Sequence, residues 1–367
     1  MNIIFDNIIF SLQKSGGGSV YWYELVRRFS KTNNKIKYLE QNRKNKNLFR
    51  KNLEITNSKR FNLFPLEIIR FLPVFKKLRK KTIFHSSYYR VLLSSKAINV
   101  TTIHDFTPEY FFLGISKRIN NLQKNFAIRH SDGIICISEN TKKDLLKFHP
   151  KAANKDIKVI YNGVSDSFFK IKNVKKLIQA IVDTEVKGVL EKSYILYVGH
   201  RTNYKNFAIA VETMKEISNN YHFVIVGEPL NKIEKEYIYS FLSDNDFTVL
   251  SKKNNEVLNL LYNQAFCLLY PSSYEGFGIP ILEAMKAGCP VVTTNKSSIP
   301  EVAGDAAIMI DNISALEFQH AIISLSNDDI RKGLIQKGYA QSAKFSWDKS
   351  FNEVMLFYKK LYENEQN

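Results

Sequence analysis

The chain has 367 residues, of which 44% are hydrophobic and 24% are charged. This length and apolar content are sufficient for two hydrophobic cores, so we expect two domains. The opening stretch Asn2–Asp6 is too short and too acid-interrupted for a signal peptide or a spanning helix, which favours a cytoplasmic protein. Cys136, Cys267 and Cys289 lack metal-ligand spacing, which predicts core packing rather than zinc binding or a disulfide.

The net charge of +18 comes entirely from the first part of the chain. Residues 1–165 contain 31 Lys and Arg against 11 Asp and Glu, or +20, whereas residues 166–367 contain 22 against 24, or −2. Such an excess indicates either an anionic partner or a solvated basic face. The segment Leu66–Lys81 mixes apolar side chains with a cationic tail, which suits an anionic membrane surface. No RRM, KH or helix-turn-helix signature accompanies the basic residues, so nucleic acid is not expected as a partner.

In chain order, the first part alternates short strand-like and helix-like segments. The predicted strands are Ile3–Phe5, Thr82–His85, Asn99–Ile103, Gly133–Ile137 and Lys158–Tyr161. The predicted helices are Val20–Phe29, Ser116–His130 and Glu139–Phe148. This alternation predicts a parallel α/β domain over residues 1–165.

A second strand–helix series follows a linker placed at Asn162–Val164 and the Lys-rich helical stretch 170–192. Its predicted strands are Tyr194–Val198, His222–Val226, Phe247–Val249, Phe266–Leu269, Val291–Thr293 and Ala307–Ile310. These indicate a second doubly wound domain over residues 166–345, followed by a helical segment at 346–367. Two such domains in tandem predict a ligand cleft between them.

A glycine-rich turn between two glutamates, within residues 270–304, is the most informative motif. Gly276 and Gly278 leave main-chain N–H groups unshielded, and Pro280 suits the first turn of a helix whose N-terminus attracts anions. The carboxylates of Glu275 and Glu283 can accept hydrogen bonds from sugar hydroxyls. The pattern alone leaves two interpretations open: a phosphorylated-sugar site, or an ordinary strand–turn–helix with surface glutamates.

This motif resembles the E-x7-E signature of retaining glycosyltransferases of family 4, and the resemblance extends over nearly the whole chain. It implies the GT-B fold: two Rossmann-like parallel-sheet domains that face a central cleft, with a C-terminal helix that crosses back to the N-domain. It further implies that Glu275 lies by the donor sugar and Glu283 contacts the nucleotide ribose. The implied backbone donors to the sugar are Gly276, Phe277 and Gly278.

Two cations follow the predicted strand Tyr194–Val198. On sequence alone, Arg201 and Lys205 suit a solvated loop as well as a site for a charged leaving group. The resemblance implies that both clamp the donor diphosphate. Family members often carry Arg directly after the glycine, where this chain has His200, so Arg201 is a shifted candidate.

Two features of the first domain also match the family. The loop 15–19 opens a helix with exposed N–H groups, and the resemblance places Gly17 and Gly18 against the donor diphosphate. A lone histidine is usually structural, but the resemblance implies that His104, at the carboxyl end of a predicted strand, lines the sugar and acceptor pocket. Asp105 is expected to orient this loop or to bind acceptor, and no general base is assigned.

The sequence Asp244-Asn245-Asp246 superficially matches a D-x-D metal motif. It precedes the predicted strand Phe247–Val249 and is typical of a helix-ending turn, so we expect no metal site there. The resemblance accordingly implies a metal-independent transferase without a cofactor.

The resulting hypothesis is a hexosyltransferase that moves a sugar from a nucleoside-diphosphate donor to a lipid-linked oligosaccharide. The implied setting is O-antigen, lipopolysaccharide or capsule assembly at the inner face of the bacterial inner membrane, with peripheral attachment through the basic first domain. GDP-linked donors are slightly favoured, and UDP- or dTDP-linked donors stay open. The alternatives are a GT-B nucleotide-sugar epimerase or hydrolase, and a basic nucleic-acid or membrane-binding module.

Overall fold

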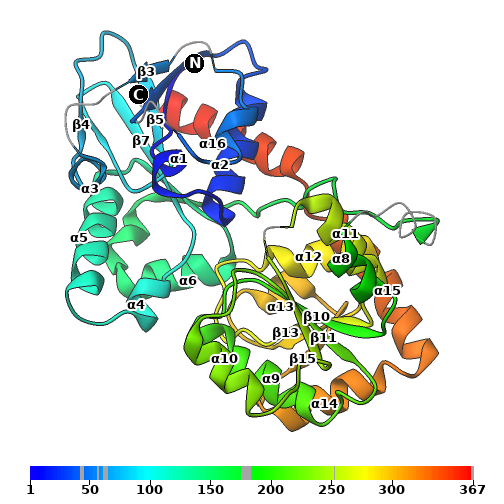
Figure 1. Ribbon diagram of the computed structural model, residues 1–367. Coiled ribbons are helices and arrows are strands. Elements are labelled where there is room, and N and C mark those ends of the chain that lie inside the picture. The colour runs from blue at the N-terminus through cyan, green and yellow to red at the C-terminus, as the bar shows by residue number, and fades with distance from the viewer. Residues whose placement is uncertain (42–44, 56–57, 61–64, 175–182, 252, 365–367) are drawn as a thin grey trace. The chain divides into compact units, whose positions relative to one another are not determined.

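Alternating buried strands and helices form two parallel α/β units in the computed structural model, which describes residues 1–41, 45–55, 58–60, 65–174, 183–251 and 253–364. Unit 1 comprises Met1–Gly163 with Trp347–Asn367, and unit 2 comprises Val164–Ser346 (Figure 1). The expected domain borders, after residues 165 and 345, lie close to these divisions. Each unit is described by itself.

Unit 1 is built on a seven-stranded parallel sheet in the order β3-β2-β1-β5-β7-β8-β9. Its strands are β1 (Asn2–Asp6), β2 (Lys35–Glu40), β3 (Ser58–Arg60), β5 (Thr82–Ser86), β7 (Ala97–Ile103), β8 (Gly133–Cys136) and β9 (Asp156–Val159). A separate two-stranded sheet pairs β4 (Val74–Phe75) with β6 (Leu92–Leu93).

The first four strands predicted in unit 1 are confirmed, but the fifth begins two residues earlier than Lys158. Asp156 already pairs with Gly133 in the parallel register of β8 and β9, so the strand begins at Asp156. The sequence pattern missed β2 and β3. In β2 the first half, with Lys35 and Lys37, is largely exposed, and only its last three residues are buried.

The helices of unit 1 cover this sheet. They are α1 (Ile9–Leu12), α2 (Gly17–Phe29), α3 (Leu66–Ile69), α4 (Thr107–Phe111), α5 (Gly114–His130), α6 (Glu139–Phe148) and α16 (Trp347–Asn364), with 3-10 turns η1 (Arg50–Asn52) and η2 (Pro150–Asn154). The predicted helices at 116–130 and 139–148 are confirmed, and the one expected from Val20 begins at Gly17.

The last helix, α16, returns to unit 1 and packs beside α2 (Figure 1). The Phe29 ring of α2 lies 4.9 Å from that of Phe351 and 5.3 Å from that of Tyr358. Tyr358 also bonds through its hydroxyl to the buried His85 of β5. Aromatic pairs and this buried hydrogen bond therefore fix the end of the chain against the first part.

Unit 2 contains a six-stranded parallel sheet in the order β12-β11-β10-β13-β14-β15. Its strands are β10 (Tyr194–Val198), β11 (His222–Val226), β12 (Phe247–Leu250), β13 (Cys267–Tyr270), β14 (Val291–Thr294) and β15 (Ile308–Ile310). All six expected strands are present, with ends that differ by at most one residue. The order reverses between β10 and β13, which makes this the switch point where doubly wound sheets bind ligands.

Helices lie on both faces of the second sheet (Figure 1). They are α8 (Thr184–Leu190), α9 (Phe207–Lys215), α10 (Lys232–Tyr239), α11 (Asn255–Gln264), α12 (Ile279–Ala287), α13 (Ile299–Ala303), α14 (Ala315–Ser324) and α15 (Asp328–Ser342), with the 3-10 turn η3 (Asn203–Lys205). Of the linker expected to be helical at 170–192, residues 175–182 lie outside the described part and α8 accounts for 184–190.

All three cysteines are buried free thiols, so the prediction that they pack in the core is confirmed. Within the residues that the structure describes, no helix combines the length and the apolar content needed to cross a membrane.

The contact between β8 and α16 gives a stability prediction. A Cβ added at Gly133 would lie 2.4 Å from Leu361 Cδ1 and 2.9 Å from the Phe357 ring. Gly133→Ala should therefore cost about 1–3 kcal/mol through overpacking, measured by urea unfolding. Gly333→Ala in α15 is the control: its Cβ would meet nothing within 4 Å, and it should stabilise the protein by about 0.5–1 kcal/mol. A Gly133→Ala protein as stable as wild type would contradict this packing.

Candidate active site

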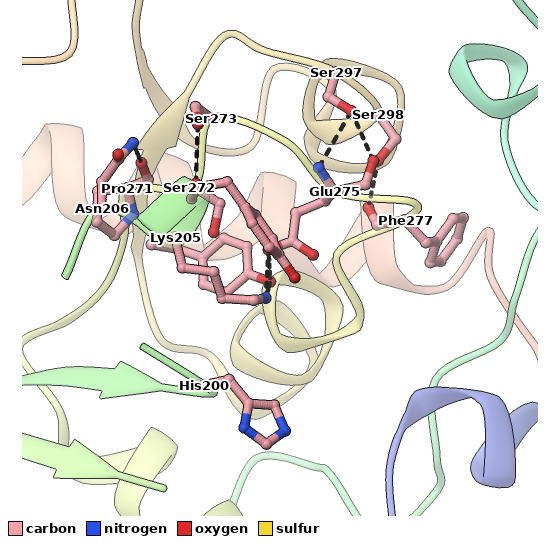
Figure 2. Close-up of polar contacts among 12 residues, drawn as sticks. His200, Lys205, Asn206, Pro271, Ser272, Ser273, Glu275, Phe277, Ser297 and Ser298 are labelled. Carbon is pink, nitrogen blue, oxygen red and sulfur yellow. Dashed lines mark hydrogen bonds and ion pairs between the residues drawn. The ribbon is translucent and has the colours of Figure 1, made fainter. Parts of the chain in front are cut away.

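Three neighbouring parallel strands of unit 2 end at the same edge of the sheet. The loops after β10, β13 and β14 carry Lys205, Glu275 and Ser297, which lie together in Figure 2. Because the chain order reverses between β10 and β13, no crossover helix covers this point from either strand. Side chains far apart in the sequence therefore meet at one place.

The glycine-rich turn after β13 is held by two serines from the start of α13 (Figure 2). The Ser297 hydroxyl donates to the Glu275 carbonyl oxygen at 2.7 Å, and the Glu275 N–H donates back to Ser297 Oγ at 3.2 Å. The Ser298 hydroxyl lies 2.8 Å from the same carbonyl oxygen and 3.1 Å from that of Phe277. These bonds fix the main chain on both sides of Gly276.

The turn ends in a left-handed residue that starts α12. Gly278 has φ 101° and precedes the first helical residue, Ile279, with Pro280 in the first turn as expected. A side chain would be strained at this φ, so glycine is required there. The aligned peptide dipoles of α12 give this end of the helix a positive potential.

An ion pair joins the two loops beside the turn. Lys205 Nζ lies 2.6 Å from Glu275 Oε1, and the Tyr270 hydroxyl donates to the same oxygen at 2.7 Å. The two charged side chains are 13% and 12% exposed, so the pair is shielded but can be reached from solvent. The next residue, Asn206, has φ 51° and its amide donates to the Pro271 carbonyl oxygen at 2.8 Å, which fastens the Lys205 loop to β13.

The second glutamate of the motif lies in a different environment. Glu283, in α12, is partly buried and accepts a hydrogen bond from the Tyr262 hydroxyl at 3.0 Å. Burial raises the pKa of Glu283 to about 7, although the Tyr262 bond acts in the opposite direction. One carboxylate of the motif is thus ion-paired, while the other lies close to its protonation midpoint at neutral pH.

The structure does not bring Arg201 to this pair. Its Nε and Nη2 lie 3.0 and 3.1 Å from the two carboxylate oxygens of Glu234 in α10, and Nη2 also donates to the Pro229 carbonyl oxygen. The side chain is only 4% exposed, and its Nη1 is buried without a hydrogen-bond partner. In this arrangement Arg201 holds the loop after β10 against α10, so its role as a diphosphate clamp stays a prediction.

His200, which stands where relatives often carry arginine, is exposed on the same loop. Figure 2 shows its imidazole without a contact to the other residues drawn. Its carbonyl oxygen accepts a hydrogen bond from the Tyr197 hydroxyl at 3.0 Å, so the backbone is anchored while the side chain faces solvent.

Unit 1 contains the second group of candidates. His104 follows β7, and its ring lies edge-on to that of Tyr21, 5.0 Å away. Burial lowers the pKa of His104 to about 4, with Asp105 opposing and Lys124 reinforcing this shift. Asp105 accepts a hydrogen bond from the Thr107 N–H at 2.9 Å, and its role in orienting the loop or binding acceptor stays a prediction.

A buried ion pair beneath this loop was not anticipated. Lys124 of α5 lies 2.8 Å from Glu109 of α4, and the two side chains are 2% and 3% exposed. The same ammonium donates to the Asp105 carbonyl oxygen at 3.0 Å. Lys124 therefore ties the loop that carries His104 to the core-facing side of α5.

Gly17 and Gly18 lie in the first turn of α2, after the left-handed Gly16 with φ 144°. No atom lies within 4 Å of a Cβ built on Gly17, which leaves its main chain open. A role toward a diphosphate stays a prediction for both glycines.

The rejected metal motif is a turn, as expected. The Asp246 carboxylate accepts hydrogen bonds at 2.7 Å from the Ser243 N–H and hydroxyl, and the segment 244–246 leads directly into β12. Over the described ranges, the structure has no group of three or more His, Cys, Asp or Glu side chains arranged to hold a metal ion.

Sequence reasoning missed the residues that fix the motif rather than the motif itself. Ser297, Ser298 and Tyr270 hold Glu275 and its turn, and Tyr262 contacts Glu283. The available signal was positional: Tyr270 ends a buried strand, and the serines follow the next one at the same edge.

The fold is similar to that of Anabaena HepE, whose structure was determined in complex with UDP-glucose. The TM-score is 0.75 at 17% sequence identity, over 98% of this chain and 100% of that one. Two Rossmann-like units with parallel sheets and this structural likeness define the GT-B fold of glycosyltransferases.

Two family descriptions match consecutive parts of the sequence. Glycosyltransferase Family 4 matches residues 15–168, and Glycosyl transferases group 1 matches residues 183–341. Between them they account for most of the chain, which belongs to these glycosyltransferases.

Two of the relatives are O-antigen mannosyltransferases of bacteria. It is 43% identical over 109 residues to O-antigen chain mannosyltransferase B of Escherichia coli, covering 29% of this chain and 28% of the relative. It is 26% identical over 225 residues to O-antigen chain mannosyltransferase RfbU of Salmonella typhimurium, covering 60% and 59%. The chain thus matches less than two thirds of the length of either relative.

The raised pKa of Glu283 predicts a pH-dependent stability. A folded pKa of about 7 exceeds the ordinary value of 4.5. The folded protein therefore holds a proton that the unfolded chain releases, and this group's contribution falls as pH rises from about 4.5 to 7. Glu283→Gln removes the titration, so the melting-temperature difference between wild type and variant should shift in the variant's favour between pH 5 and pH 8. This shift corresponds to a change of about 1–2 kcal/mol in the difference between the two unfolding free energies, after a reduction for solvent screening of the partly exposed carboxylate.

Glu256→Gln, an exposed glutamate of α11, is the charge-matched control for this series. A difference between wild type and Glu283→Gln that stays constant over the same pH range would contradict a raised pKa.

The buried pair in unit 1 predicts a strong asymmetry between single and double variants. Glu109→Gln leaves the Lys124 ammonium buried without its carboxylate, which should cost about 3–5 kcal/mol in urea unfolding. Combining Glu109→Leu with Lys124→Met removes both charges and should recover most of that loss. A single variant that loses less than about 1 kcal/mol would show that the pair is solvated.

Proposed function

We propose that this protein is a retaining, metal-independent glycosyltransferase that moves a sugar from a nucleoside-diphosphate donor to a lipid-linked oligosaccharide in bacterial surface-polysaccharide assembly. The observation that carries the proposal is the Lys205–Glu275 pair beside the helix-opening turn at the β10/β13 switch point. A cation, a carboxylate and the N-terminus of α12 meet there.

Each of these groups matches one requirement of the reaction. Cleavage of the bond between sugar and diphosphate leaves negative charge on the phosphate, which the Lys205 ammonium and the N-terminus of α12 stabilise. This arrangement supplies positive potential from the chain itself. When donor phosphates attract Lys205, Glu275 keeps its Tyr270 bond at 2.7 Å and is available to accept from a sugar hydroxyl.

Glu283 is proposed to receive the ribose hydroxyls. Its carboxylate already accepts one hydrogen bond, from Tyr262, and has lone pairs for two more. Only the ionised form serves as acceptor for both hydroxyls. Because the pKa is about 7, donor affinity should weaken as pH falls below neutrality.

The relatives' names support a mannosyl donor, since both act on O-antigen chains as mannosyltransferases. The donor is proposed to be GDP-linked, with UDP- and dTDP-sugars as the competing candidates. The HepE complex with UDP-glucose supports the broader class, a nucleoside-diphosphate sugar.

On the acceptor side we assign His104 and Asp105. With its pKa lowered to about 4 by burial, His104 is neutral at physiological pH and can exchange hydrogen bonds with an acceptor hydroxyl. Asp105 keeps the loop in place. A lipid-linked acceptor places the enzyme at the inner face of the inner membrane, attached peripherally by the basic unit 1.

Removal of the paired charges should slow transfer. Lys205→Met and Glu275→Gln should each lower kcat at least tenfold, about 1.4 kcal/mol or more, in an assay of donor consumption. Lys253→Met is the matched control: Lys253 is 14% exposed and lies 2.6 Å from Asp183, so it loses a similar pair elsewhere in unit 2. Near-normal turnover in both site variants would overturn the assignment.

A donor panel separates the competing functions. GDP-, UDP- and dTDP-sugars are compared by thermal shift, and the donor that stabilises the protein most is then incubated with and without oligosaccharide acceptor. A transferase consumes donor in proportion to added acceptor. Acceptor-independent consumption would instead favour a nucleotide-sugar epimerase or hydrolase.

A further inference from the structure

A ring contact holds the imidazole of His104 in unit 1. Its ring lies edge-on to that of Tyr21 in α2, with the centroids 5.0 Å apart and the planes at 83°. Among the residues that the structure describes, neither ring nitrogen of His104 makes a hydrogen bond. The side chain is half-buried, so the packing against Tyr21 orients the ring while its nitrogens stay available to a ligand.

The Tyr21 ring is itself fixed through its hydroxyl. This hydroxyl lies 3.1 Å from Thr102 Oγ1, and both side chains are buried. Thr102 belongs to β7 and stands two residues before His104, so the two side chains leave the chain on the same side. Burial raises the pKa of Tyr21 to about 12, which keeps the hydroxyl neutral at physiological pH.

Thr102 is also part of a buried chain of hydrogen bonds that extends to the last helix. His85 Nε2 of β5 lies 2.9 Å from Thr102 Oγ1, and His85 Nδ1 bonds to the Tyr358 hydroxyl of α16. Burial lowers the pKa of His85 to about 3, so this imidazole is neutral. Either neutral tautomer donates to one of these partners and accepts from the other. The chain therefore anchors Tyr21 to both β5 and α16.

The helix that carries Tyr21 also carries the candidate diphosphate contacts. Gly17 and Tyr21 are four residues apart in α2, so they lie on the same face of this helix. The first turn of α2 and the ring that packs on His104 therefore belong to one rigid element. Tyr21 links the position of the imidazole to that of the glycine turn.

We propose that Tyr21 is a positioning residue, which fixes the direction in which His104 presents its ring nitrogens to an acceptor hydroxyl. An imidazole can rotate about two single bonds, and a hydrogen bond to a reacting group requires one of the resulting orientations. The ring contact selects that orientation, and the Thr102 bond prevents Tyr21 from following a moving imidazole. The inference rests on the proposed function, because that function assigns the acceptor contact to His104.

The same contact affects the protonation of His104. The Tyr21 ring covers the imidazole and contributes to the burial that lowers its pKa to about 4. The other titratable groups that face His104 are Asp105 on its own loop, Lys124 of α5 and His85 of β5. A substitution at Tyr21 leaves all three in place. A raised pKa of His104 in such a variant therefore reports the loss of the ring contact.

The direct test is an NMR titration of the histidines in the full chain, which needs neither donor nor acceptor. The chain has 7 histidines, and His104→Asn assigns the signal. Tyr21→Leu removes the covering ring, so the pKa of His104 should rise from about 4 toward its ordinary value of 6.5. Tyr21→Phe keeps the ring and should leave this pKa close to the wild-type value.

Transfer is measured with the same variants at saturating donor. Tyr21→Leu should lower kcat over acceptor KM about tenfold, and Tyr21→Phe should recover most of this loss. The loss in Tyr21→Leu should be larger at pH 6 than at pH 8, because His104 is partly protonated at pH 6 in this variant alone. The thermal shift with donor should stay as in wild type.

Tyr194→Phe in unit 2 is the matched control. Tyr194 is equally buried, and its hydroxyl donates to the Leu261 carbonyl oxygen at 2.7 Å. It begins β10, at the end of the strand opposite to the Lys205 loop. The control should lose stability as Tyr21→Phe does, while it keeps the wild-type pKa of His104 and the wild-type turnover. If Tyr21→Leu does not fold, Tyr21→Met, which fills more of the space, replaces it in both measurements.

Two outcomes would overturn the proposal. A pKa of His104 that is the same in Tyr21→Leu and wild type would show that the ring does not cover the imidazole. A loss of transfer that is equal at pH 6 and pH 8, and no larger than in Tyr194→Phe, would reduce Tyr21 to a residue that only stabilises the fold. A wild-type protein that consumes no donor would instead contradict the proposed function, and the titration would still decide whether Tyr21 covers His104.

Discussion

The site in unit 2 depends on one constraint, the parallel pairing of β10 with β13 and of β13 with β14. Parallel neighbours end at the same edge, so Lys205, Glu275 and Ser297 are brought together although they are up to 92 residues apart. The reversal of strand order at β10 and β13 leaves the edge uncovered between them. Without this pairing, the motif would be a turn and the lysine a surface charge.

In this site the fixed conformation of the main chain matters as much as the chemistry of the side chains. Asn206 and Ser297 adopt positive φ values of 51° and 57°, which cost energy for residues other than glycine. Each is compensated by bonds across the site: Asn206 to the Pro271 carbonyl oxygen, and Ser297 to the main chain of Glu275. The strain is therefore located where it fixes the positions of a cation and a carboxylate before any ligand arrives.

Much of this arrangement could be predicted from sequence, because its signals are local. Strands of unit 2 are short buried runs flanked by turns, and β10 and β11 were placed to the residue. The glycine-rich turn and the residues on either side of it were also recognisable. The ion pair between Lys205 and Glu275 could not be predicted, because the sequence does not show that two charged residues 70 positions apart are in contact.

Two features of the structure were not indicated by the sequence, and each has a physical reason. Arg201 stays a predicted diphosphate clamp, and the structure pairs it with both carboxylate oxygens of Glu234 in α10, a contact that the sequence did not indicate. The strand β2 was overlooked because its exposed lysines mask its buried end.

The charge count alone does not describe the surface of unit 1. Arg90 is 4% exposed and bonds to the buried Asp6, and Lys124 is buried against Glu109, so neither contributes to a surface potential. The Lys76 ammonium is buried as well, and burial lowers its pKa. The +20 of the first part is therefore divided between internal pairing and the surface.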